Sequence, residues 1–277
     1  MAGPDLHIHS TASDGVLTPT ATVAQAARAG CPAIAITDHD TVGGVAEALA
    51  AAAHSAVTFI PAVELSAGVD GRDLHILGYH IDHTDPTLLA HLERLRGVRR
   101  QRAGRIVISL NDAGIEVSLD DVLRLADGGS VGRAHIAQLL VASGNAASVE
   151  DAFRRLLGRS APHYVPKPLC SPAEVIGWIR HAGGVPVIAH PGLSNVDDLI
   201  PDLVRTGLLG IEAYHSTHDP GTVGRYLLIA RESDLIVTGG SDFHGLDRDG
   251  DRLGSADVPI DVIDRLAAAH EQVRAGR

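Results

Sequence analysis

The chain has 277 residues, of which 45% are hydrophobic and 21% are charged. That apolar fraction can bury a core, which excludes an intrinsically disordered protein. The net charge of −11 is poorly suited to coating duplex DNA, although a mononucleotide or other short ligand needs only local positive charge. Two cysteines exclude a disulfide scaffold, and no apolar run approaches the roughly 20 residues that span a bilayer. We therefore expect a cytoplasmic protein with no signal peptide and no membrane partner.

Short apolar runs typical of buried strands recur along the chain. They lie at residues 5–9, 33–37, 58–65, 73–79, 185–189, 210–214 and 235–239. Helical segments lie between many of them, at 21–29, 43–54, 171–180 and from 219 onward. Strands that alternate with helices predict a parallel α/β fold. The exception is segment 66–72, where Asp70-Gly71 predicts a hairpin between the third and fourth strands.

Residues 94–165 contain several predicted helices and no clear strand. The predicted helices are 94–111, 119–126, 133–142 and 149–157. We interpret this segment as a helical insertion that caps the substrate site of an α/β barrel. The barrel is then expected to comprise residues 1–93 and 166–277, with the insertion at 94–165.

Histidines and acidic residues gather at the predicted strand ends. Asp5, His7 and His9 alternate along the first strand, so their side chains share one face, where two histidines form a compact metal chelate. Later strands contain or precede His39, Glu64, His75, His190, Glu212, Asp242 and His244. Because barrel active sites lie at the carboxyl ends of strands, this pattern predicts one site there.

The ligand types indicate which metals the site would hold. Imidazole and carboxylate ligands without thiolates suit catalytic Mn²⁺, Fe²⁺ or Zn²⁺. About nine candidate ligands are too many for one ion and suit two or three ions a few ångströms apart. Such an arrangement stabilises the attacking and leaving oxygens in phosphoester hydrolysis.

Six motifs occur in order along the chain: DLHIHS (5–10), TDHD (37–40), VELS (63–66), LHILGY (74–79), AHPG (189–192) and GSDFH (240–244). With them the sequence resembles the polymerase-and-histidinol-phosphatase (PHP) family of metal-dependent phosphoesterases over its whole length. The resemblance implies a distorted seven-stranded (β/α) TIM-like barrel with a trinuclear metal centre, for which Mn²⁺ is favoured.

The resemblance also implies which residues hold three ions. The first ion would be bound by His7, His9, Glu64 and Asp242, with Glu64 bridging to a second ion that His75 and His190 complete. The third would be bound by Asp14, His39 and His244, and several family members have histidine where Asp14 stands. A metal-bound water would attack phosphorus, with Asp14, His39, Glu64 and Asp242 as supporting residues. Asp38, Asp40 and Glu212 are expected to orient the ligand histidines.

The insertion resembles the nucleotide-acting branch of the family, through segments 109–115, 131–141 and 151–166. That branch includes 3′,5′-nucleoside bisphosphate phosphatases, which remove the 3′-phosphate, and 5′–3′ exoribonucleases of short RNA. The resemblance implies that Arg99 and Arg102, on a segment rich in arginine, contact the non-reacting 5′-phosphate. It also implies substrate contacts by Arg133 and His218, whereas His215 would lie behind the ligands or at the surface.

Two further hypotheses remain open. The first is a phosphatase for another small phosphomonoester such as histidinol phosphate, against which the arginine-rich insertion argues. The second is a non-catalytic module like those attached to some polymerases, against which the complete set of candidate ligands argues. We therefore expect a metal-dependent phosphoric monoester hydrolase that acts on a small phosphorylated nucleotide or on short RNA.

Overall fold

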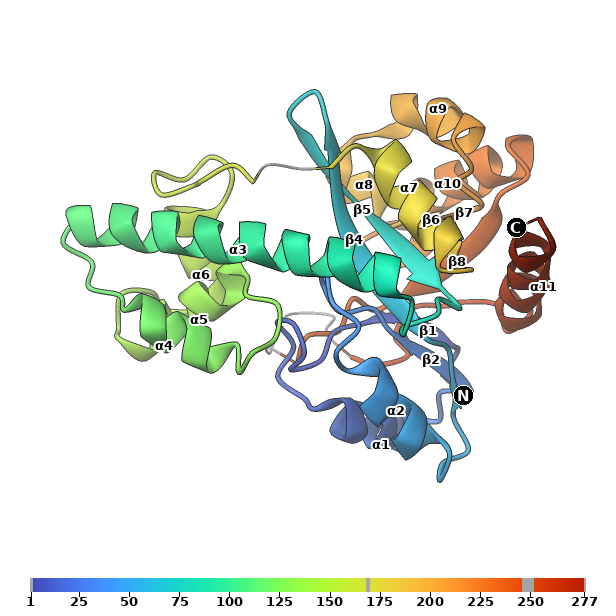
Figure 1. The fold of residues 1–277 in the computed structure, drawn as a ribbon, viewed down its shortest axis with the longest axis horizontal. Helices are drawn as coiled ribbons and strands as arrows, with labels where there is room; N and C mark the ends of the chain where they lie inside the picture. The colour runs from blue at the N-terminus through green and yellow to red at the C-terminus, as the bar shows by residue number, and fades with distance from the viewer. Residues whose placement is uncertain (1, 168–169, 246–251, 277) are drawn as a thin grey trace.

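The structure is a computed structural model that describes residues 2–167, 170–245 and 252–276. Its strands form two sheets (Figure 1). The first contains β1 (Asp5–Ile8), β2 (Ala33–Ile36) and β3 (Thr58–Phe59), which are parallel. The second contains, in spatial order, β4 (Ala62–Val69), β5 (Arg72–Tyr79), β6 (Val185–Ile188), β7 (Gly210–His215) and β8 (Ile236–Gly240). Within it, β5 runs antiparallel to both of its neighbours, and the remaining pairs are parallel.

The mixed α/β fold agrees with the prediction, but a closed barrel is not shown. The described strands form two sheets that are linked by isolated bridges. One bridge pairs Ile8 with Phe243, and another pairs His39 with Glu64. Both junctions therefore lie at or beside residues that are expected to bind metal.

The predicted strand at 58–65 is wrong as a single element. Pro61 separates β3 from β4, because proline has no N–H with which to continue the ladder. The hairpin between β4 and β5 is tighter than the predicted turn at 66–72. Only Asp70 and Gly71 lie between the strands, and their φ angles of +50° and +74° are those of a type I′ turn.

Helices surround the two sheets (Figure 1). The longer ones are α1 (Pro19–Ala29), α2 (Val45–Ala52), α7 (Pro172–His181), α10 (Pro220–Glu232) and α11 (Val262–Ala275). As expected, Thr18 caps α1 ahead of a first-turn proline, and Gly30 ends it with a φ of +78°. Short helices that were not predicted follow β6: α8 (Pro191–Ser194), the 3₁₀ turn η2 (Asp197–Leu199) and α9 (Ile200–Arg205). Among the described helices, none has the length and apolarity that crossing a membrane requires.

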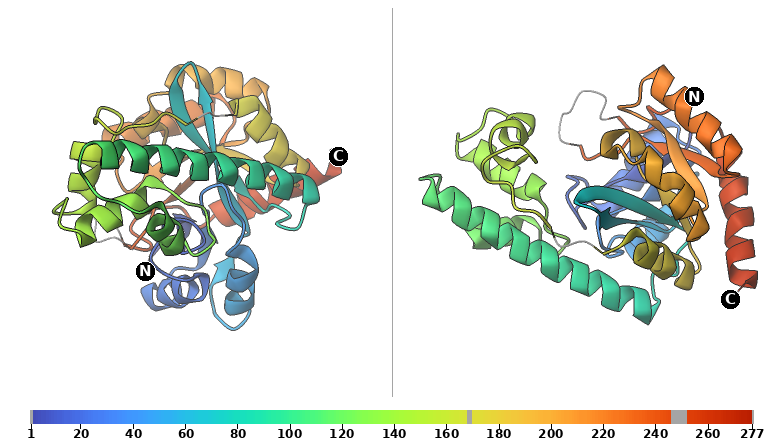
Figure 2. Two further views of the ribbon diagram at one scale, coloured as in Figure 1. Left: turned by 60° about the vertical axis from the view of Figure 1, so that its left-hand side comes forward. Right: turned by 90° about the horizontal axis from the view of Figure 1, so that it is seen from above.

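The insertion has its own apolar core. Its main helix, α3 (Pro86–Asp112), begins earlier than the predicted residue 94. Leu88, Leu92 and Leu95 in its first half pack on the core beneath β4 to β7, whereas its second half packs on a separate cluster. In the right-hand view of Figure 2 the long helix α3 runs from the sheets to the short helices of the insertion. That cluster includes residues of α4 (Leu119–Leu125), α5 (Arg133–Ala142), α6 (Val149–Ala152) and a π-helical turn, η1 (Phe153–Leu157). The helix α3 thus belongs to both cores, and Ser130 and Tyr164 of the insertion add hydrogen bonds to Ala12 and Asp73.

The contact between β1 and β8 depends on Gly240. A Cβ atom there would lie 2.4 Å from the backbone nitrogen of His7 and 2.5 Å from its Cβ. We expect Gly240→Ala to force the strands apart and to lower the free energy of unfolding by about 1–3 kcal/mol. Gly97→Ala in α3, where no atom lies within 4 Å of the missing Cβ, is the matched control. It should be neutral or stabilise by roughly 0.5–1 kcal/mol. Urea unfolding checks both variants, and an unchanged midpoint for Gly240→Ala would contradict the tight contact.

Candidate metal centre

All nine predicted metal ligands meet in one cluster, although Glu64 lies near the amino end of β4 and His75 lies midway along the antiparallel strand β5. They form overlapping groups in which the ligand atoms lie within 4.8 Å of one another. The groups are His9, Asp14, His39 and His244; His7, Glu64 and His190; His7, His9 and Asp242; and His39, Glu64 and His75. Because neighbouring groups share residues, the arrangement offers several adjacent positions for cations.

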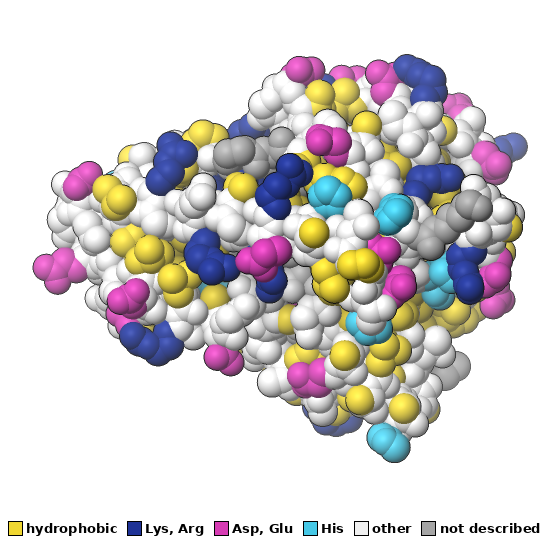
Figure 3. Space-filling view, in the orientation of Figure 1, with side chains coloured by type: hydrophobic (Ala, Val, Ile, Leu, Met, Phe, Trp, Pro, Cys, Tyr) yellow, Lys and Arg dark blue, Asp and Glu magenta, His cyan; other side chains and the backbone are white. Residues whose placement is uncertain are grey.

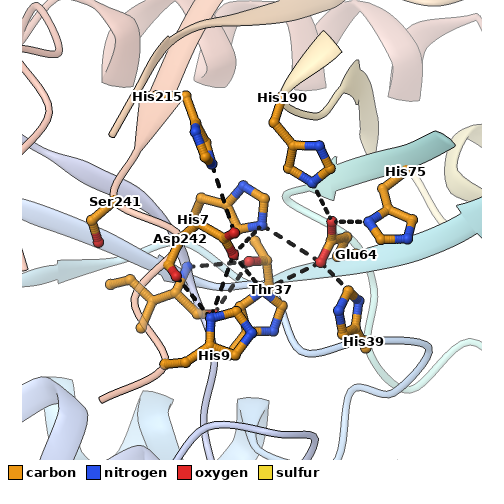
Figure 4. A network of polar contacts seen from close by, with 12 residues as sticks. His7, His9, Thr37, His39, Glu64, His75, His190, His215, Ser241 and Asp242 are labelled. Atoms are coloured by element: carbon orange, nitrogen blue, oxygen red, sulfur yellow. Dashed lines mark hydrogen bonds and ion pairs between the residues drawn. The ribbon is translucent and has the colours of Figure 1, made fainter. Parts of the chain in front are cut away.

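Glu64, on β4, lies at the centre of this cluster (Figure 4). The histidines with a ring nitrogen within 3.5 Å of its carboxylate are His7, His9, His39, His75 and His190. Oε1 is 2.7 Å from Nδ1 of His75 and 3.1 Å from Nε2 of His190, whereas Oε2 is 2.8 Å from Nδ1 of His39. The two oxygens thus face different sets of ligands, as a bridging carboxylate requires.

Asp242 and Asp14 face His9 from two sides. Oδ1 of Asp242 lies 3.1 Å from Nε2 of His9 and 3.4 Å from Nε2 of His7. Oδ1 of Asp14 lies 3.7 Å from Nδ1 of His9 and 3.5 Å from Nε2 of His244. His9 therefore joins the group around Asp242 to the group around Asp14.

Unpaired buried atoms indicate that this cluster suits cations. The buried atoms without a hydrogen-bond partner among the described residues include Nε2 of His7 and His9, Nδ1 of His39 and His75, Oδ1 of Asp14 and Oε2 of Glu64. A buried polar atom left without a partner costs about 1–3 kcal/mol. Divalent ions would supply the missing partners, and the imidazole and carboxylate donors suit Mn²⁺, Fe²⁺ or Zn²⁺.

The ionisation of the cluster also favours cations. Burial would raise the pKa of Glu64, but interactions with the surrounding histidines, above all His39 and His75, lower it well below its usual range. Burial lowers the pKa of His39 to about 4. Burial would also lower the pKa of His9, but Asp242 and Glu64 raise it to about 10. A dication bound beside His9 would replace that proton, so metal affinity should fall as the pH falls.

Three residues at the strand ends have left-handed backbone conformations. The φ angles are +52° for Asp40, +26° for His190 and +55° for Asp242. Residues other than glycine rarely adopt such angles, and each costs about 1–3 kcal/mol. These sharp turns occur where the chain leaves the strands and carries side chains to the cluster.

Two of the three expected supporting carboxylates contact the ligands or their immediate partners. Glu212, which is fully buried, lies 2.9 Å from Nδ1 of His7 and accepts the backbone N–H of His190 at 2.7 Å. Asp38 accepts the hydroxyl of Ser13, whose Oγ lies 3.4 Å from Nδ1 of His9. Glu212 is thus placed to orient a ligand directly, whereas Asp38 acts through a serine.

His215, at the end of β7, is also part of this centre. Its side chain is only 1% exposed, so the alternative of a surface position is wrong. The backbone N–H of Thr217 donates to Nδ1, and Nε2 lies 3.7 Å from Oδ2 of Asp242. His215 was not among the predicted site residues, and its position directly after a predicted strand, like that of His190, is the signal that points to it.

A cavity of about 260 Å³ opens beside the cluster. Asp14, His39, Glu64, His75, His190, Asp242 and His244 line it together with Arg99, Arg102, Arg133, Phe153 and Lys167. Three of the four predicted substrate contacts therefore line it. The fourth, His218, instead lines a separate cavity with Tyr214 and Leu227, and its Nδ1 lies 2.9 Å from the carbonyl oxygen of Ala213.

Two of the cations in this cavity share one carboxylate. Arg99 donates through Nε to Asp40 and through Nη2 to Oγ of Ser66, at 3.1 Å for the latter. Nζ of Lys167 lies 3.6 Å from Asp40, and burial, with Arg99 beside it, lowers the pKa of Lys167 to about 7. Asp40 thus pairs with these cations rather than with a histidine. Lys167 was not predicted, because no motif surrounds it.

The other two cations have no such partner. Arg102 donates through Nε to the carbonyl oxygen of Val165 at 2.7 Å, and Arg133 donates to that of Leu157 at 3.0 Å. Within the part of the chain that the structure describes, neither guanidinium forms an ion pair with a carboxylate. Burial, with Arg133 nearby, lowers the pKa of Arg102 to about 10, and its buried Nη2 has no hydrogen-bond partner. This pair is therefore positive charge without a direct ion pair among the described residues, and Asp73, which also lines the cavity, acts on both arginines from farther away.

Substitution of the central carboxylate tests the cluster. We expect Glu64→Gln to lose bound metal and to reduce phosphoester hydrolysis by several orders of magnitude, because a neutral amide cannot balance two dications. Elemental analysis of protein purified without chelator should find two or three ions per wild-type chain and fewer in the variant. Glu232→Gln, at the exposed end of α10, should change neither quantity. Retention of wild-type metal content and turnover by Glu64→Gln would refute the bridging role.

Comparisons with known proteins agree with this centre. The PHP domain family matches residues 5–161. The chain is 38% identical to a 3′,5′-nucleoside bisphosphate phosphatase of Chromobacterium violaceum, covering 94% of this chain and 93% of the relative. It is 37% identical to the 5′-3′ exoribonuclease Rnm of Escherichia coli, covering 87% of this chain and 84% of that relative. A solved structure of a candidate metal-dependent phosphoesterase from Bifidobacterium adolescentis, 32% identical, superposes with a TM-score of 0.91 and covers 96% of each chain. The chain belongs to the PHP domain family.

Proposed function

We propose that this protein is a metal-dependent phosphomonoesterase that removes the 3′-phosphate from nucleoside 3′,5′-bisphosphates. The observation that carries the proposal is the presence, in one cavity, of the cluster around Glu64 and of Arg102 and Arg133, neither of which forms an ion pair with a described carboxylate. The cluster would receive the reacting phosphate, and the guanidinium pair would receive the second phosphate. The bisphosphate phosphatase from Chromobacterium violaceum, similar over nearly the whole chain, supports this assignment.

The proposed cofactor is a set of two or three divalent ions, with Mn²⁺ favoured and Fe²⁺ or Zn²⁺ as alternatives. The first position would be held by His7, His9, Glu64 and Asp242, the second by Glu64, His75 and His190, and the third by Asp14, His39 and His244. When bound, the ions would neutralise the phosphate oxygens and activate water for attack on phosphorus.

The side chains of the protein orient the reactants. Glu212 fixes the ring of His7 through Nδ1 and leaves Nε2 facing the cluster. Arginine donates two parallel hydrogen bonds to phosphate oxygens, so Arg102 and Arg133 would hold the second phosphate at a defined position. The insertion, which contributes both arginines, would also cover the cavity and limit the access of water.

Arg99 has a different task in this proposal from the phosphate contact expected from sequence. Its Nε and Nη2 are engaged by Asp40 and Ser66, which follow His39 and Glu64 closely in the chain. We therefore assign the second phosphate to Arg102 and Arg133. Arg99 acts as a positioning residue that holds the strand ends carrying His39 and Glu64 against α3.

A second candidate function is a 5′–3′ exoribonuclease acting on short RNA. The relative Rnm from Escherichia coli, at 37% identity, supports it. In both reactions water displaces the 3′-oxygen of the first nucleotide from phosphorus, and the scissile phosphate differs only in whether it carries a further nucleoside. On the face seen in Figure 3, acidic side chains are interspersed with the basic ones, as suits a short substrate better than duplex DNA.

A substrate panel tests the proposed function. We expect kcat/KM for adenosine 3′,5′-bisphosphate to exceed that for 3′-AMP about ten- to hundredfold, because a charge-assisted hydrogen bond contributes roughly 1.5–3 kcal/mol. Measuring the rate of phosphate release from each substrate checks this expectation. In parallel, cleavage of a 5′-phosphorylated dinucleotide is measured by analysing the nucleotides that it releases. Faster turnover of the dinucleotide would select the exoribonuclease. A preference for histidinol phosphate would contradict both functions.

Arginine variants test where the second phosphate binds. Arg102→Ala should lower kcat/KM for adenosine 3′,5′-bisphosphate about ten- to hundredfold and leave p-nitrophenyl phosphate nearly unaffected, because only the former has a second phosphate. Arg99→Ala should lower kcat/KM for both substrates by the same factor, because the loss of Arg99 displaces Asp40 and the strand ends beside it. Arg105→Ala, an exposed position on the same helix, is the control. Steady-state kinetics that show equal losses for Arg102→Ala would reject its phosphate contact.

A further inference from the structure

A second cavity, of about 430 Å³, lies beside β7 and α10, apart from the first cavity at the metal cluster. One face of α10 lines it, with side chains at helical spacing: Pro220, Val223, Gly224 and Leu227. Residues 255–257 also line it. In Figure 1 the short helices α4 to α6 of the insertion lie on one side of β4 and β5, and β7 and α10 lie on the other. The second cavity is therefore on the side of the sheets away from those helices.

Two histidines connect the second cavity to the metal centre. His215 lines the second cavity, and its Nε2 lies 3.7 Å from Oδ2 of Asp242, which lines the first. His218 lines the second cavity too, and a Cβ atom added at Gly192 would lie 2.8 Å from its Nε2. Gly192 directly precedes Leu193, which lines the first cavity. The two cavities are thus neighbours, and the side chain of His215 stands between the second one and a candidate metal ligand.

The lining of the second cavity suits an uncharged, largely apolar group. Its described part contains neither lysine nor arginine, and Asp257 is the only carboxylate in that part. A phosphate would find no counter-charge among these residues. Tyr214 and the aliphatic side chains of Val223 and Leu227 offer contact to the faces of a nucleobase instead. The volume falls within the range of roughly 300–1,000 Å³ that is typical of small-molecule sites.

We propose that the second cavity binds the nucleoside on the 3′ side of the scissile phosphate in a short RNA. The inference rests on the proposed function in its exoribonuclease form. There the 5′-phosphate of the first nucleotide lies at Arg102 and Arg133 in the insertion, and the scissile phosphate lies at the Glu64 cluster. The strand that continues beyond the scissile phosphate then extends away from the insertion, toward β7 and α10. Because the described lining has no cation for a further phosphate, the cavity takes one nucleoside, and longer RNA gains nothing there.

Three diesters of adenosine 3′,5′-bisphosphate test this subsite in the metal-loaded enzyme. On the 3′-phosphate they carry a second adenosine, an abasic ribose or a methyl group, and the same 3′-oxygen leaves phosphorus in each. We expect kcat/KM for the dinucleotide to exceed that for the methyl diester about ten- to hundredfold, with the abasic diester close to the methyl diester, as base stacking predicts. A third nucleotide should add less than about threefold. Equal values for the dinucleotide and the methyl diester would overturn the proposal.

Two variants localise the subsite. No atom lies within 4 Å of the missing Cβ of Gly224, so Gly224→Leu extends a side chain into the cavity. It should lower kcat/KM for the dinucleotide about tenfold or more and leave adenosine 3′,5′-bisphosphate and the methyl diester unchanged. Gly177→Leu in α7 is the matched control, because Gly177 has equally open surroundings and lines neither cavity. Leu227→Ala should act in the same direction as Gly224→Leu, and its neighbour Leu228→Ala, exposed at 55%, should have no effect. Equal losses on both diesters in Gly224→Leu would reject the subsite.

Binding measurements separate this inference from the proposed function. Isothermal titration calorimetry on the metal-loaded enzyme compares the dinucleotide with the methyl diester whether or not either is cleaved. If the dinucleotide binds about ten- to hundredfold more tightly but is not hydrolysed, the exoribonuclease reaction is wrong and the subsite stands. If both diesters are hydrolysed with equal kcat/KM and bind equally, the subsite is wrong and the reaction stands.

Discussion

The buried carboxylate of Glu64 is the constraint on which the rest of the structure depends. Its side chain is 1% exposed, and ionised carboxylates in such surroundings cost several kcal/mol unless positive charge compensates them. Histidine nitrogens approach both of its oxygens, but Oε2 has no hydrogen-bond partner in the part of the chain that the structure describes. Metal ions would provide the compensation that the protein groups leave incomplete. The two sheets, which meet at the bridge between His39 and Glu64, hold this carboxylate in place.

The insertion is linked to this centre through a second buried charge. Arg99 extends from α3 to Asp40, which follows the candidate ligand His39, and to Ser66, which lies two residues after Glu64. Burial would raise the pKa of Asp40, but Arg99 and Lys167 lower it well below its usual range, so the pair is ionised at neutral pH. The same helix contributes Arg102, which forms no ion pair with a carboxylate of the described residues. One helix therefore carries an arginine that organises the metal centre and another that is available to a substrate.

The composition of the metal centre could be predicted from sequence because strand geometry is regular. Side chains alternate along a strand, so His7 and His9 had to share a face, and parallel strands bring their carboxyl ends together. The tight hairpin at Asp70 and Gly71 followed from turn chemistry, whereas the break at Pro61 was missed because the apolar pattern continues across it. The seven-stranded barrel was expected from family resemblance, and the described strands instead form two sheets.

The substrate side of the cavity was less predictable, because it depends on contacts between distant segments. Arg99 and Arg102 are three residues apart on one helix, so helical spacing could not distinguish them. What separates them is Asp40, which lies 59 residues before Arg99. Lys167 and Phe153 approach the site from the far end of the insertion, and no motif marks either. His218 was expected at the substrate and lines a different cavity, because its position depends on the turn after β7.

X-ray diffraction at the manganese absorption edge, from crystals of the protein grown with Mn²⁺, tests the central claim most directly. The claim is that the two oxygens of Glu64 join neighbouring metal ions. It predicts two or three anomalous peaks, with an adjacent pair roughly 3.5–4 Å apart and Glu64 between them. A single peak, or peaks that do not contact Glu64, would contradict it.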